Sequence, residues 1–356
     1  MLELKGIILH GGHGTRLRPL THTGPKQLLP IANKPMSQYA LEDLKNSGII
    51  DIGIIIGGVY SEKVKEYYGT GEKFGVNITY IKQDSPKGIS HAISLCKNFI
   101  GNDKFIVYLG DNVLRKDLVD YTKKFQSSDS DAMILLCKVK DAKRFGIAVL
   151  DKENPNKINQ IIEKPKNPPS DLAVIGIYFL TPKIFNIINK LKPSWRGELE
   201  ITDALQLLMD QKNKIEYDIV TGWWKDTGTP EDIIDANKLV LDSFDITNNE
   251  KNSKYPKNIL IGKNCKISEN SILKGPIIMG DNCVVSSATI GPNVSIGDNS
   301  ILENCGIENS ILMNDCKIIS TTHIFDSIIA NGSEIKKSTL DKKQQFLLGE
   351  RSQVNL

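Results

Sequence analysis

The sequence has no paired cysteines of the kind that bind zinc or build a disulfide framework. Its six cysteines are scattered, and none belongs to a Cys-x-x-Cys pair, so we expect free, mostly buried thiols. An excess of one charge is also missing, because 45 basic and 42 acidic residues leave a formal net charge of +3. This balance argues against binding to nucleic acid or to a membrane surface. Any site for a polyanion must therefore be local.

Long apolar runs are absent as well. No stretch reaches the roughly 18 consecutive apolar residues that a membrane-spanning helix needs. The opening, MLELKGIILHGG, has neither the basic and long apolar segments nor the small-residue cleavage site of a secretory signal. We therefore expect a cytoplasmic protein. Its 356 residues are enough for two domains with sizeable cores.

The first part of the chain, residues 1–241, alternates two patterns. Short apolar runs such as GIILHGG and KFIVYLGDN are separated by segments with helical spacing, such as SQYALEDLKNSG. This alternation predicts an α/β domain with a Rossmann-like, doubly wound sheet. Ligands of such sheets bind at the carboxyl ends of the strands. The glycines of 11–14 and Asp111 both follow apolar runs directly, so both are expected at such ends.

The last part, residues 259–356, follows a polar segment, 242–258, that we interpret as a linker. Apolar residues recur every six positions, as at Ile290, Ile296 and Leu302, with Asn, Asp, Ser and Gly between them. This period predicts a parallel β-helix of hexapeptide repeats, because each coil must stack on the next to bury its inner face. The exposed faces and the open end of such a stack favour a homo-oligomer.

The opening stretch IILHGGHGTRLRPLTHTGPKQLLPIANKPM combines glycines with cations. Gly11, Gly12 and Gly14 allow backbone N–H groups to converge on a phosphate, and Arg16 and Lys26 add positive charge. A glycine-rich turn by itself is more often only a turn after a strand. The pattern alone therefore leaves both interpretations open.

The order of the motifs along the chain resembles the sugar-1-phosphate nucleotidylyltransferases. The opening GGHGTRLRPLT…PKQLLPIANKPM is similar to the signature of that family, and Lys26-Gln27 is similar to the glucose-1-phosphate thymidylyltransferases in particular. The motifs that follow in the family's order are QDSPKGISHA, YLGDN, RFGIAVLD, IIEKPK, RGELEITD and WWKDTGTPEDI. The repeats and the ending LLGERSQV resemble the long form, which carries a C-terminal left-handed β-helix.

The resemblance implies a magnesium-dependent transfer of a nucleotidyl group from dTTP to glucose 1-phosphate, giving dTDP-glucose and pyrophosphate. Arg16, Lys26, Asp111 and Asp226 would be the catalytic residues, with the two aspartates as Mg²⁺ ligands. Three alternatives remain at this point. One is the use of UTP with glucose or N-acetylglucosamine 1-phosphate. Another is an added acetyltransferase activity of the β-helix, for which His323 is the candidate base. The third is a non-catalytic, regulatory relative.

Two further groups of residues are assigned to substrates through the resemblance. Gln27 and Gln83 each present an amide donor and acceptor, which suits the edge of thymine or uracil. The expected nucleotide-binding residues are Leu9, Gly11, Gly12, Gly14, Thr15, Gln27, Gln83, Pro86 and Gly88. The expected sugar-phosphate-binding residues are Gly146, Glu163, Lys164, Val174 and Arg196.

Some positions depart from the family or remain ambiguous. His10 stands where the family has a small residue, which is either a tolerated substitution or a shift in base or sugar preference. Arg196 is expected to contact phosphates or to form an ion pair with Glu198 or Glu200. Trp223 and Trp224 are expected in the core rather than as stacking platforms. We expect no direct role for Arg18, His22 and His91.

Overall fold

The computed structural model describes residues 4–12, 14–58, 60–243, 256, 258–336 and 343–356. By packing, the chain forms two compact units, one from 1–12 and 37–226 and the other from 13–36 and 227–356. The boundaries predicted above, 1–241 and 259–356, follow the texture of the sequence and stay a prediction. The predicted linker, 242–258, lies almost wholly outside the described residues. Within the described ranges, no helix is long and apolar enough to cross a membrane.

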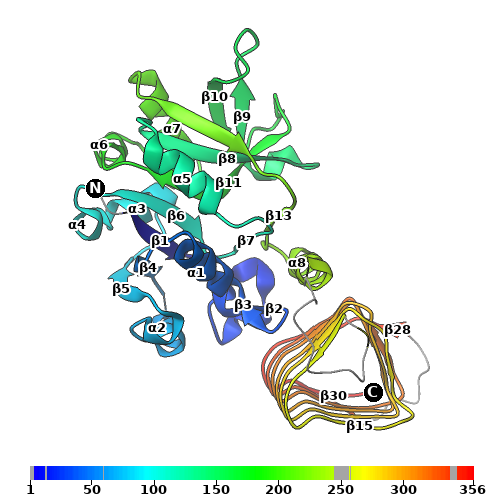
Figure 1. Cartoon of the computed structure of the whole chain (residues 1–356). Coiled ribbons are helices and arrows are strands. Elements are labelled where there is room, and N and C mark those ends of the chain that lie inside the picture. Colours follow the sequence, from blue (N-terminus) through cyan, green and yellow to red (C-terminus); the bar gives the residue numbers. More distant parts are fainter. Residues whose placement is uncertain (1–3, 13, 59, 244–255, 257, 337–342) are drawn as a thin grey trace. The chain divides into compact units, whose positions relative to one another are not determined.

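A mixed sheet forms the centre of the first unit (Figure 1). Its nine strands, counted over the described residues, are β1 (Leu4–His10), β4 (Asp51–Ile56), β5 (Asn77–Lys82), β6 (Lys104–Leu109), β8 (Ala132–Lys138), β9 (Gly146–Leu150), β10 (Ile158–Glu163), β11 (Leu172–Leu180) and β12 (Ile215–Ile219). The order is β10-β9-β11-β6-β1-β4-β5, and β8 pairs with both β11 and β12. Strands β6, β1, β4 and β5 are parallel, whereas β11 is antiparallel to its neighbours. The predicted Rossmann-like sheet is confirmed.

Helical spacing predicts one helix each for SQYALEDLKNSG, SEKVKEYYGTGEKFG and GISHAISLCKNFIG, and the helices of the first unit differ from this in two of the three segments. They are α1 (Met36–Asn46, of which Met36 belongs to the second unit), α2 (Ser61–Tyr68), α3 (Ile89–Ser94), α4 (Lys97–Ile100), α5 (Val119–Ser127), α6 (Lys183–Ile188) and α7 (Ile201–Asp210). The segment SEKVKEYYGTGEKFG is helical only as far as Tyr68, because Gly69 and Gly71 adopt φ values of +56° and +91°. The segment GISHAISLCKNFIG contains the two short helices α3 and α4 instead of one.

One apolar cluster of this unit lies against one face of the sheet. Ile7 and Leu9 of β1 and Phe105 and Val107 of β6 join one apolar cluster with residues of α3, α6 and α7. The alternation of side chains along a strand places His10 on the opposite face from Leu9. Ile8, Ile54 and Ile106, which alternate with residues of this cluster along β1, β4 and β6, are buried as well, so both faces of the sheet are covered.

The point where the order of the parallel strands reverses lies between β1 and β6. β1 pairs with β4 on one side and with β6 on the other, and Leu9 stands opposite Leu109. The backbone N–H of Gly110 donates to the carbonyl of Leu9 over 3.0 Å. The segments that begin at Gly11 and at Asp111 therefore leave neighbouring strands at the same edge, where crevices form in doubly wound sheets.

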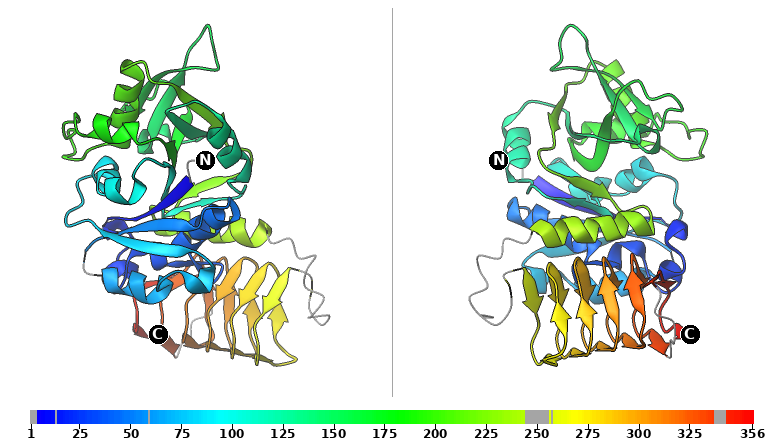
Figure 2. Two further views of the ribbon diagram at one scale, coloured as in Figure 1. Left: turned by 60° about the vertical axis from the view of Figure 1, so that its left-hand side comes forward. Right: turned by 90° about the vertical axis from the view of Figure 1, so that its right-hand side faces the viewer.

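The second unit is dominated by stacked coils of short parallel strands (Figure 2). Over the described residues these strands form three sheets, with the orders β14-β17-β20-β23-β26-β29, β15-β18-β21-β24-β27-β30 and β16-β19-β22-β25-β28. The strands are β14 (Ile259–Ile261), β15 (Lys266–Ile267), β16 (Ile272–Leu273), β17 (Ile277–Met279), β18 (Val284–Ser286), β19 (Thr289–Ile290), β20 (Val294–Ile296), β21 (Ile301–Glu303), β22 (Gly306–Glu308), β23 (Ile311–Leu312), β24 (Lys317–Ile319), β25 (His323–Phe325), β26 (Ile328–Ile329), β27 (Glu334–Lys336), β28 (Lys343–Gln344), β29 (Leu347–Leu348) and β30 (Gln353–Asn355). This arrangement is consistent with the predicted left-handed β-helix.

Hydrogen-bonded ladders connect the coils at their turns. Asn282 donates to Asn299 over 3.2 Å, and Asn299 donates to Asp315 over 3.0 Å, across separations of 17 and 16 residues. These residues have φ near +57° to +59°, a conformation that Asn and Asp tolerate better than most residues. One coil is thus shorter than three full hexapeptides, which explains why the six-residue period slips.

Two further elements pack with the coils in the second unit. They are helix α8 (Pro230–Ser243) and the short pair β2 (Pro30–Ile31) and β3 (Lys34–Pro35). The amide oxygen of Asn237 in α8 accepts hydrogen bonds from the Ser295 hydroxyl (2.6 Å) and from the N–H of Ala32 (2.8 Å). All six cysteines of the chain are free thiols, and four of them are buried, as expected.

Candidate active site

Two aspartates of the first unit are brought together by a pair of short strands. β7 (Asn112–Leu114) follows Asp111 and pairs antiparallel with β13 (Trp224–Asp226), so that Asp226 stands opposite Asn112. The amide of Asn112 donates to Asp111 over 3.1 Å and accepts from the indole N–H of Trp224 over 2.7 Å. Trp224 is buried, which confirms its expected place in the core. The fold thus fixes both predicted metal ligands at the edge where β6 ends.

A second group of polar side chains surrounds Glu163 at the end of β10. The carboxylate of Glu163 accepts a hydrogen bond from the hydroxyl of Thr202 (3.0 Å) and lies 3.3 Å from Arg196 and 3.5 Å from Lys164. Burial raises the pKa of Glu163, and the neighbouring Lys164 opposes that rise. A Cβ at Gly146 would lie only 2.5 Å from the methyl carbon of Thr202, so this close packing requires a glycine. Thr202 was not among the predicted site residues.

The guanidinium of Arg196 forms ion pairs with three carboxylates. It lies 3.3 Å from Glu163, 3.0 Å from Glu198 and 3.3 Å from Glu200. The expected ion pairs with Glu198 and Glu200 are therefore confirmed, and the ion pair with Glu163 is an addition. The alternative role of Arg196 as a phosphate contact stays a prediction.

Several carboxylates influence the buried phenol of Tyr178. Burial raises the pKa of Tyr178, and the charges of Glu163, Asp111, Asp226 and Glu200 raise it further. Several carboxylates in one region repel each other unless cations compensate them. Such a region suits a divalent cation and the cationic side chains Lys164 and Arg196.

Gln83 and Gly11 meet at the other end of this edge. Gln83 follows β5 and is buried, and its amide nitrogen lies 3.0 Å from Nδ1 of His91. A Cβ at Gly11 would stand 3.5 Å from the amide oxygen of Gln83. His91, expected to have no role, therefore orients the side chain that is predicted to read the base. Sequence spacing gives no signal for this contact beyond the separation of eight positions between the two residues.

Gly88 closes the loop that follows Gln83. It has a φ of +99°, and a Cβ there would lie 2.6 Å from the carbonyl oxygen of Leu199. The N–H of Leu199 donates to the carbonyl of Lys87 (2.8 Å). Only glycine permits this approach. Of the other predicted residues in this unit, Leu9 and Val174 lie in the apolar core, Gly12 has a φ of +92°, and Pro86 is exposed.

His10 packs behind the predicted nucleotide loop. It is buried, and its ring meets the ring of Tyr68 edge-on at 5.9 Å. Tyr68 in turn shares a hydrogen bond of 2.7 Å with Ser37. Burial lowers the pKa of His10 to about 3, so the imidazole is neutral at ordinary pH. Both ring nitrogens are buried without a hydrogen-bond partner among the described residues, and the choice between a tolerated substitution and a shifted preference stays a prediction.

The cationic residues of the opening stretch belong to the second unit. In the loop 13–36, Gly14 has a φ of +59°, and a Cβ there would lie 3.3 Å from the Cβ of Lys26. The hydroxyl of Thr21 donates to the carbonyl of Gly14 over 2.8 Å, which fixes the fold of the loop. Gln27 is buried and Lys26 half-buried. The exposed residues of this loop are Thr15, Arg16, Arg18 and His22.

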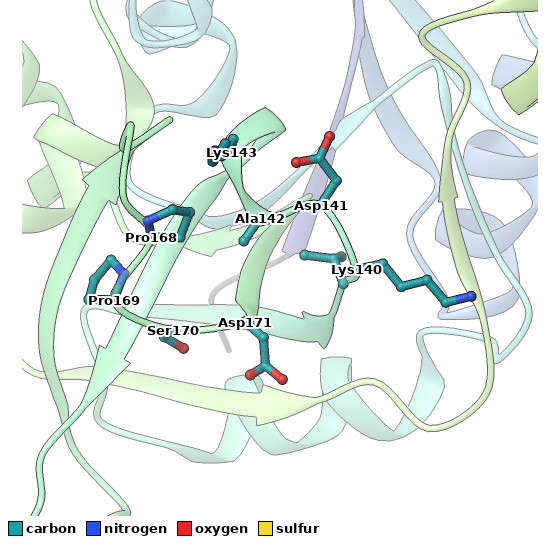
Figure 3. Close-up of a pocket in the computed structure, with 9 residues that line it drawn as sticks. Lys140, Asp141, Ala142, Lys143, Pro168, Pro169, Ser170 and Asp171 are labelled. Atoms are coloured by element: carbon teal, nitrogen blue, oxygen red, sulfur yellow. The ribbon is translucent and has the colours of Figure 1, made fainter.

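An open pocket of about 410 Å³ lies elsewhere in the first unit (Figure 3). It is formed by the segment after β8 and the segment before β11, namely residues 139–143 and 168–171. Figure 3 shows the side chain of Lys140 extending away from the other lining residues. None of the predicted site residues lines this pocket, so it does not enter the proposed function.

Comparison with known families agrees with this fold and this set of residues. The family model described as Nucleotidyl transferase matches residues 5–243, and the model described as the GMPPB C-terminal domain matches residues 282–355. The chain belongs to the nucleotidyl transferase family.

Among curated proteins, the low-salt glycan biosynthesis nucleotidyltransferase Agl11 of Haloferax volcanii is 51% identical over 239 residues. That match covers 67% of this chain and 66% of the relative, slightly under two thirds of the relative's length. Glucose-1-phosphate thymidylyltransferases of Streptomyces griseus and Streptomyces antibioticus are 38% and 39% identical, and each match covers 82% of both chains.

Two solved structures are similar to this chain. One is a glucose-1-phosphate thymidylyltransferase from Bacillus anthracis in complex with a sucrose, with 43% identity and a TM-score of 0.63. The match covers 67% of this chain and 95% of that one. The other is a UDP-glucose pyrophosphorylase complexed with UDP-glucose, with 29% identity and a TM-score of 0.61, covering 68% and 99%.

Proposed function

We propose that the protein is a glucose-1-phosphate thymidylyltransferase, which makes dTDP-glucose and pyrophosphate from dTTP and glucose 1-phosphate. The observation that carries the proposal is the pairing of β7 with β13, which places Asp226 opposite Asn112, the residue that follows Asp111 and donates to it. The similarity to thymidylyltransferases over 82% of the chain supports the same conclusion.

The proposed reaction needs alignment and charge neutralisation rather than a protein nucleophile. A phosphate oxygen of the sugar 1-phosphate attacks the α-phosphorus of dTTP, and the bond from that phosphorus to the β-phosphate oxygen breaks. The attacking oxygen is already an anion, so no residue has to remove a proton from it. Arg16 and Lys26 are proposed to bind the triphosphate and the departing pyrophosphate.

The two aspartates suit Mg²⁺ by their chemistry and by their placement. Nucleotidyltransferases of this family generally use a divalent metal. Among the described residues, no group of three or more potential ligands stands together. Mg²⁺ does not require one, because it commonly takes one or two carboxylates together with waters and phosphate oxygens. Bound by Asp111 and Asp226, it would neutralise charge on the triphosphate.

The remaining residues are proposed to select the substrates. Gln83, oriented by His91, and Gln27 would bind the donor and acceptor edge of the base. That edge is common to thymine and uracil, so UTP is the alternative nucleotide. The similarity to a UDP-glucose pyrophosphorylase is a second reason to test UTP. The Glu163 carboxylate would accept hydrogen bonds from sugar hydroxyls, and Lys164 would bind the sugar phosphate.

The β-helix is proposed to serve assembly rather than acetyl transfer. His323, the candidate base, lies in β25, and its ring fills the space beside Gly306 in the preceding coil, where a Cβ would come within 2.6 Å. The ring therefore packs on the neighbouring coil at one side, which favours a structural role, while the residue as a whole is exposed. Incubation with acetyl-CoA and a hexosamine 1-phosphate, with detection of free thiol, tests this part. A monomeric mass in light scattering would contradict the proposed homo-oligomer.

The experiment that tests the main proposal crosses five nucleotides with two sugar phosphates. dTTP, UTP, GTP, ATP and CTP are each combined with glucose 1-phosphate or N-acetylglucosamine 1-phosphate and Mg²⁺, and the nucleotide sugar is identified by mass. dTDP-glucose as the preferred product is expected. A preference for UTP or for the amino sugar would overturn the specificity but keep the reaction. No product in any mixture would indicate the non-catalytic relative.

A further inference from the structure

Trp195 is a large apolar side chain in an unusual place. It is 84% exposed, whereas the next most exposed large hydrophobic residue among those described, Ile50, is 55% exposed. Leaving an indole in water forgoes a stabilisation of the order gained by burying any large aromatic residue. Single exposed hydrophobic residues are common on proteins, so the surroundings of Trp195 must decide whether it has a role.

The loop that carries Trp195 is tied down on both sides. The N–H of Ser194 donates to the carbonyl of Glu198, and the N–H of Gly197 donates to the carbonyl of Ser194, each over 2.8 Å. The Ser194 hydroxyl donates to the Glu200 carboxylate over 2.8 Å. The backbone position of Trp195 is therefore fixed, and little ordering would be needed for its side chain to contact a ligand.

The two ends of this loop reach the two substrate regions proposed above. At one end Leu199 packs directly against Gly88 of the loop that follows Gln83, with no space for a side chain between them. At the other end Arg196, the next residue after Trp195, lies 3.3 Å from Glu163. Trp195 is therefore next in the chain to the residue whose side chain contacts Glu163, and four positions from the residue that packs against Gly88.

From this placement we propose that the indole of Trp195 stacks on the hexose ring of the bound sugar phosphate and of the nucleotide-sugar product. One face of a hexose presents C–H groups, which pack well on an aromatic ring, while its hydroxyl groups remain available to Glu163. Ligand sites commonly combine aromatic walls with a few placed polar groups. The inference rests on the proposed function only in taking the ligand to be a sugar phosphate or a nucleotide sugar.

Fluorescence measures this contact without any turnover. The chain has three tryptophans, of which Trp224 is buried and Trp223 half-buried, so the emission at long wavelength comes mainly from Trp195. Titration with dTDP-glucose, UDP-glucose or glucose 1-phosphate in EDTA is expected to give a saturable blue shift. The shift should disappear in Trp195→Phe, which keeps an aromatic ring. A shift that persists in Trp195→Phe, or no shift at saturating ligand, would overturn the proposal.

Kinetics of three variants complete the test. Trp195→Ala is expected to raise KM for the sugar phosphate about tenfold, with KM for the nucleotide changed less than about twofold. Trp195→Phe should recover most of the loss, and Ile50→Ala, a matched exposed position of the same unit, should change nothing. Equal effects on both KM values, or a changed mass of Trp195→Ala in light scattering, would assign Trp195 to folding or to a contact between chains instead.

The two proposals can fail separately. If the wild-type protein releases no pyrophosphate but a nucleotide sugar still shifts the Trp195 emission, the stacking stands and the catalytic function falls. If the protein is active and Trp195→Ala keeps the wild-type KM for the sugar phosphate, the function stands and the stacking falls.

Discussion

The sheet of the first unit and the coils of the second use polar side chains in opposite ways. In the sheet, polar groups gather at one edge, where Asp111 and Gln83 follow the ends of β6 and β5 and Glu163 is the last residue of β10. In the coils, the same residue types recur at equivalent turns, and each is bonded to its counterpart in the next coil, as Asn282 is to Asn299. In the coils, polar side chains form hydrogen bonds with the equivalent side chains of the next coil and so serve the structure. In the sheet, polar side chains from distant parts of the chain come together and can bind a ligand.

This difference also separates local from non-local interactions. The ladder bonds of the coils join residues 16 to 18 positions apart, so each coil depends mainly on its neighbours. The hydrogen bond from Trp224 to Asn112 joins residues 112 positions apart. Substitutions in the coils should therefore affect stability with little effect on activity, and substitutions at the edge of the sheet should do the reverse.

The largest effect is expected at the cationic residues of the opening stretch. Arg16→Ala and Lys26→Ala should each lower kcat by about 10²-fold or more, because charge on the transferring and departing phosphates would lose its compensation. Arg18→Ala is the matched control, since Arg18 is exposed in the same loop, and it should retain activity. A fall of similar size in Arg18→Ala would show that general positive charge, rather than these two residues, is what matters. Steady-state release of pyrophosphate measures all three.

A smaller effect is expected at Glu163. Glu163→Gln should raise KM for the sugar phosphate about tenfold, because an amide is a weaker acceptor for sugar hydroxyls than a carboxylate. The raised pKa of Glu163 predicts that the wild-type protein loses activity on acidification while the pH is still above the ordinary glutamate value. That acid limb should be missing in the variant. If the variant loses activity at the same acidic pH as the wild type, another group causes that loss. Glu198→Gln controls for the removal of one nearby negative charge.

Gly88 tests whether the backbone contact with Leu199 matters for the base. Gly88→Ala should lower kcat/KM about tenfold, because the new Cβ would lie 2.6 Å from the carbonyl oxygen of Leu199 and the loop after Gln83 would have to move. Gly101→Ala is the control: Gly101 also has a positive φ, +64°, but nothing lies within 4 Å of a Cβ there. Equal losses of activity in both variants would point to backbone strain rather than to the contact.

The smallest effect on activity is expected in the ladder of the coils. Asn299→Ala removes a donor to Asp315 and an acceptor for Asn282 at a residue with a φ of +58°. It should lower the free energy of unfolding by about 1–2 kcal/mol and leave kcat and KM unchanged. Thermal unfolding followed by circular dichroism measures the first and pyrophosphate release the second. A loss of activity without a loss of stability would contradict the assignment of the ladder to structure.

Much of the fold could be predicted because it depends on local patterns. Apolar runs closed by glycines marked β1 and β6, and the reversal of strand order brought Gly11 and Asp111 to one edge, as expected of a doubly wound sheet. The length of α2 could not be predicted, because two glycines with positive φ end it while its helical spacing continues. The six-residue period identified the β-helix, and its slips near 274–276 and 304–309 predicted irregular coils, whose shortened turns contain Asn and Asp.

The resemblance names candidate site residues, whose roles stay predictions, but it does not give the contacts among them. The family resemblance pointed to Asp226 as a metal ligand. Its position opposite Asn112, however, depends on two strands of three residues each, which are too short to detect in a sequence. Thr202 and His91 were missed for a related reason. Their bonds to Glu163 and Gln83 arise only when the helices α7 and α3 pack beside the strands that end there.

One comparison of two variants tests the central claim most directly. Asp111→Asn and Asp298→Asn make the same chemical change, one at the edge of the sheet and one in the ladder, where Asp298 accepts from the N–H of Asp281 and Asn314 accepts in the same way from Asp298. Release of pyrophosphate from dTTP and glucose 1-phosphate with Mg²⁺ should be lost in Asp111→Asn and unchanged in Asp298→Asn, with both proteins folded. Activity retained in Asp111→Asn, or lost equally in both, would contradict the account.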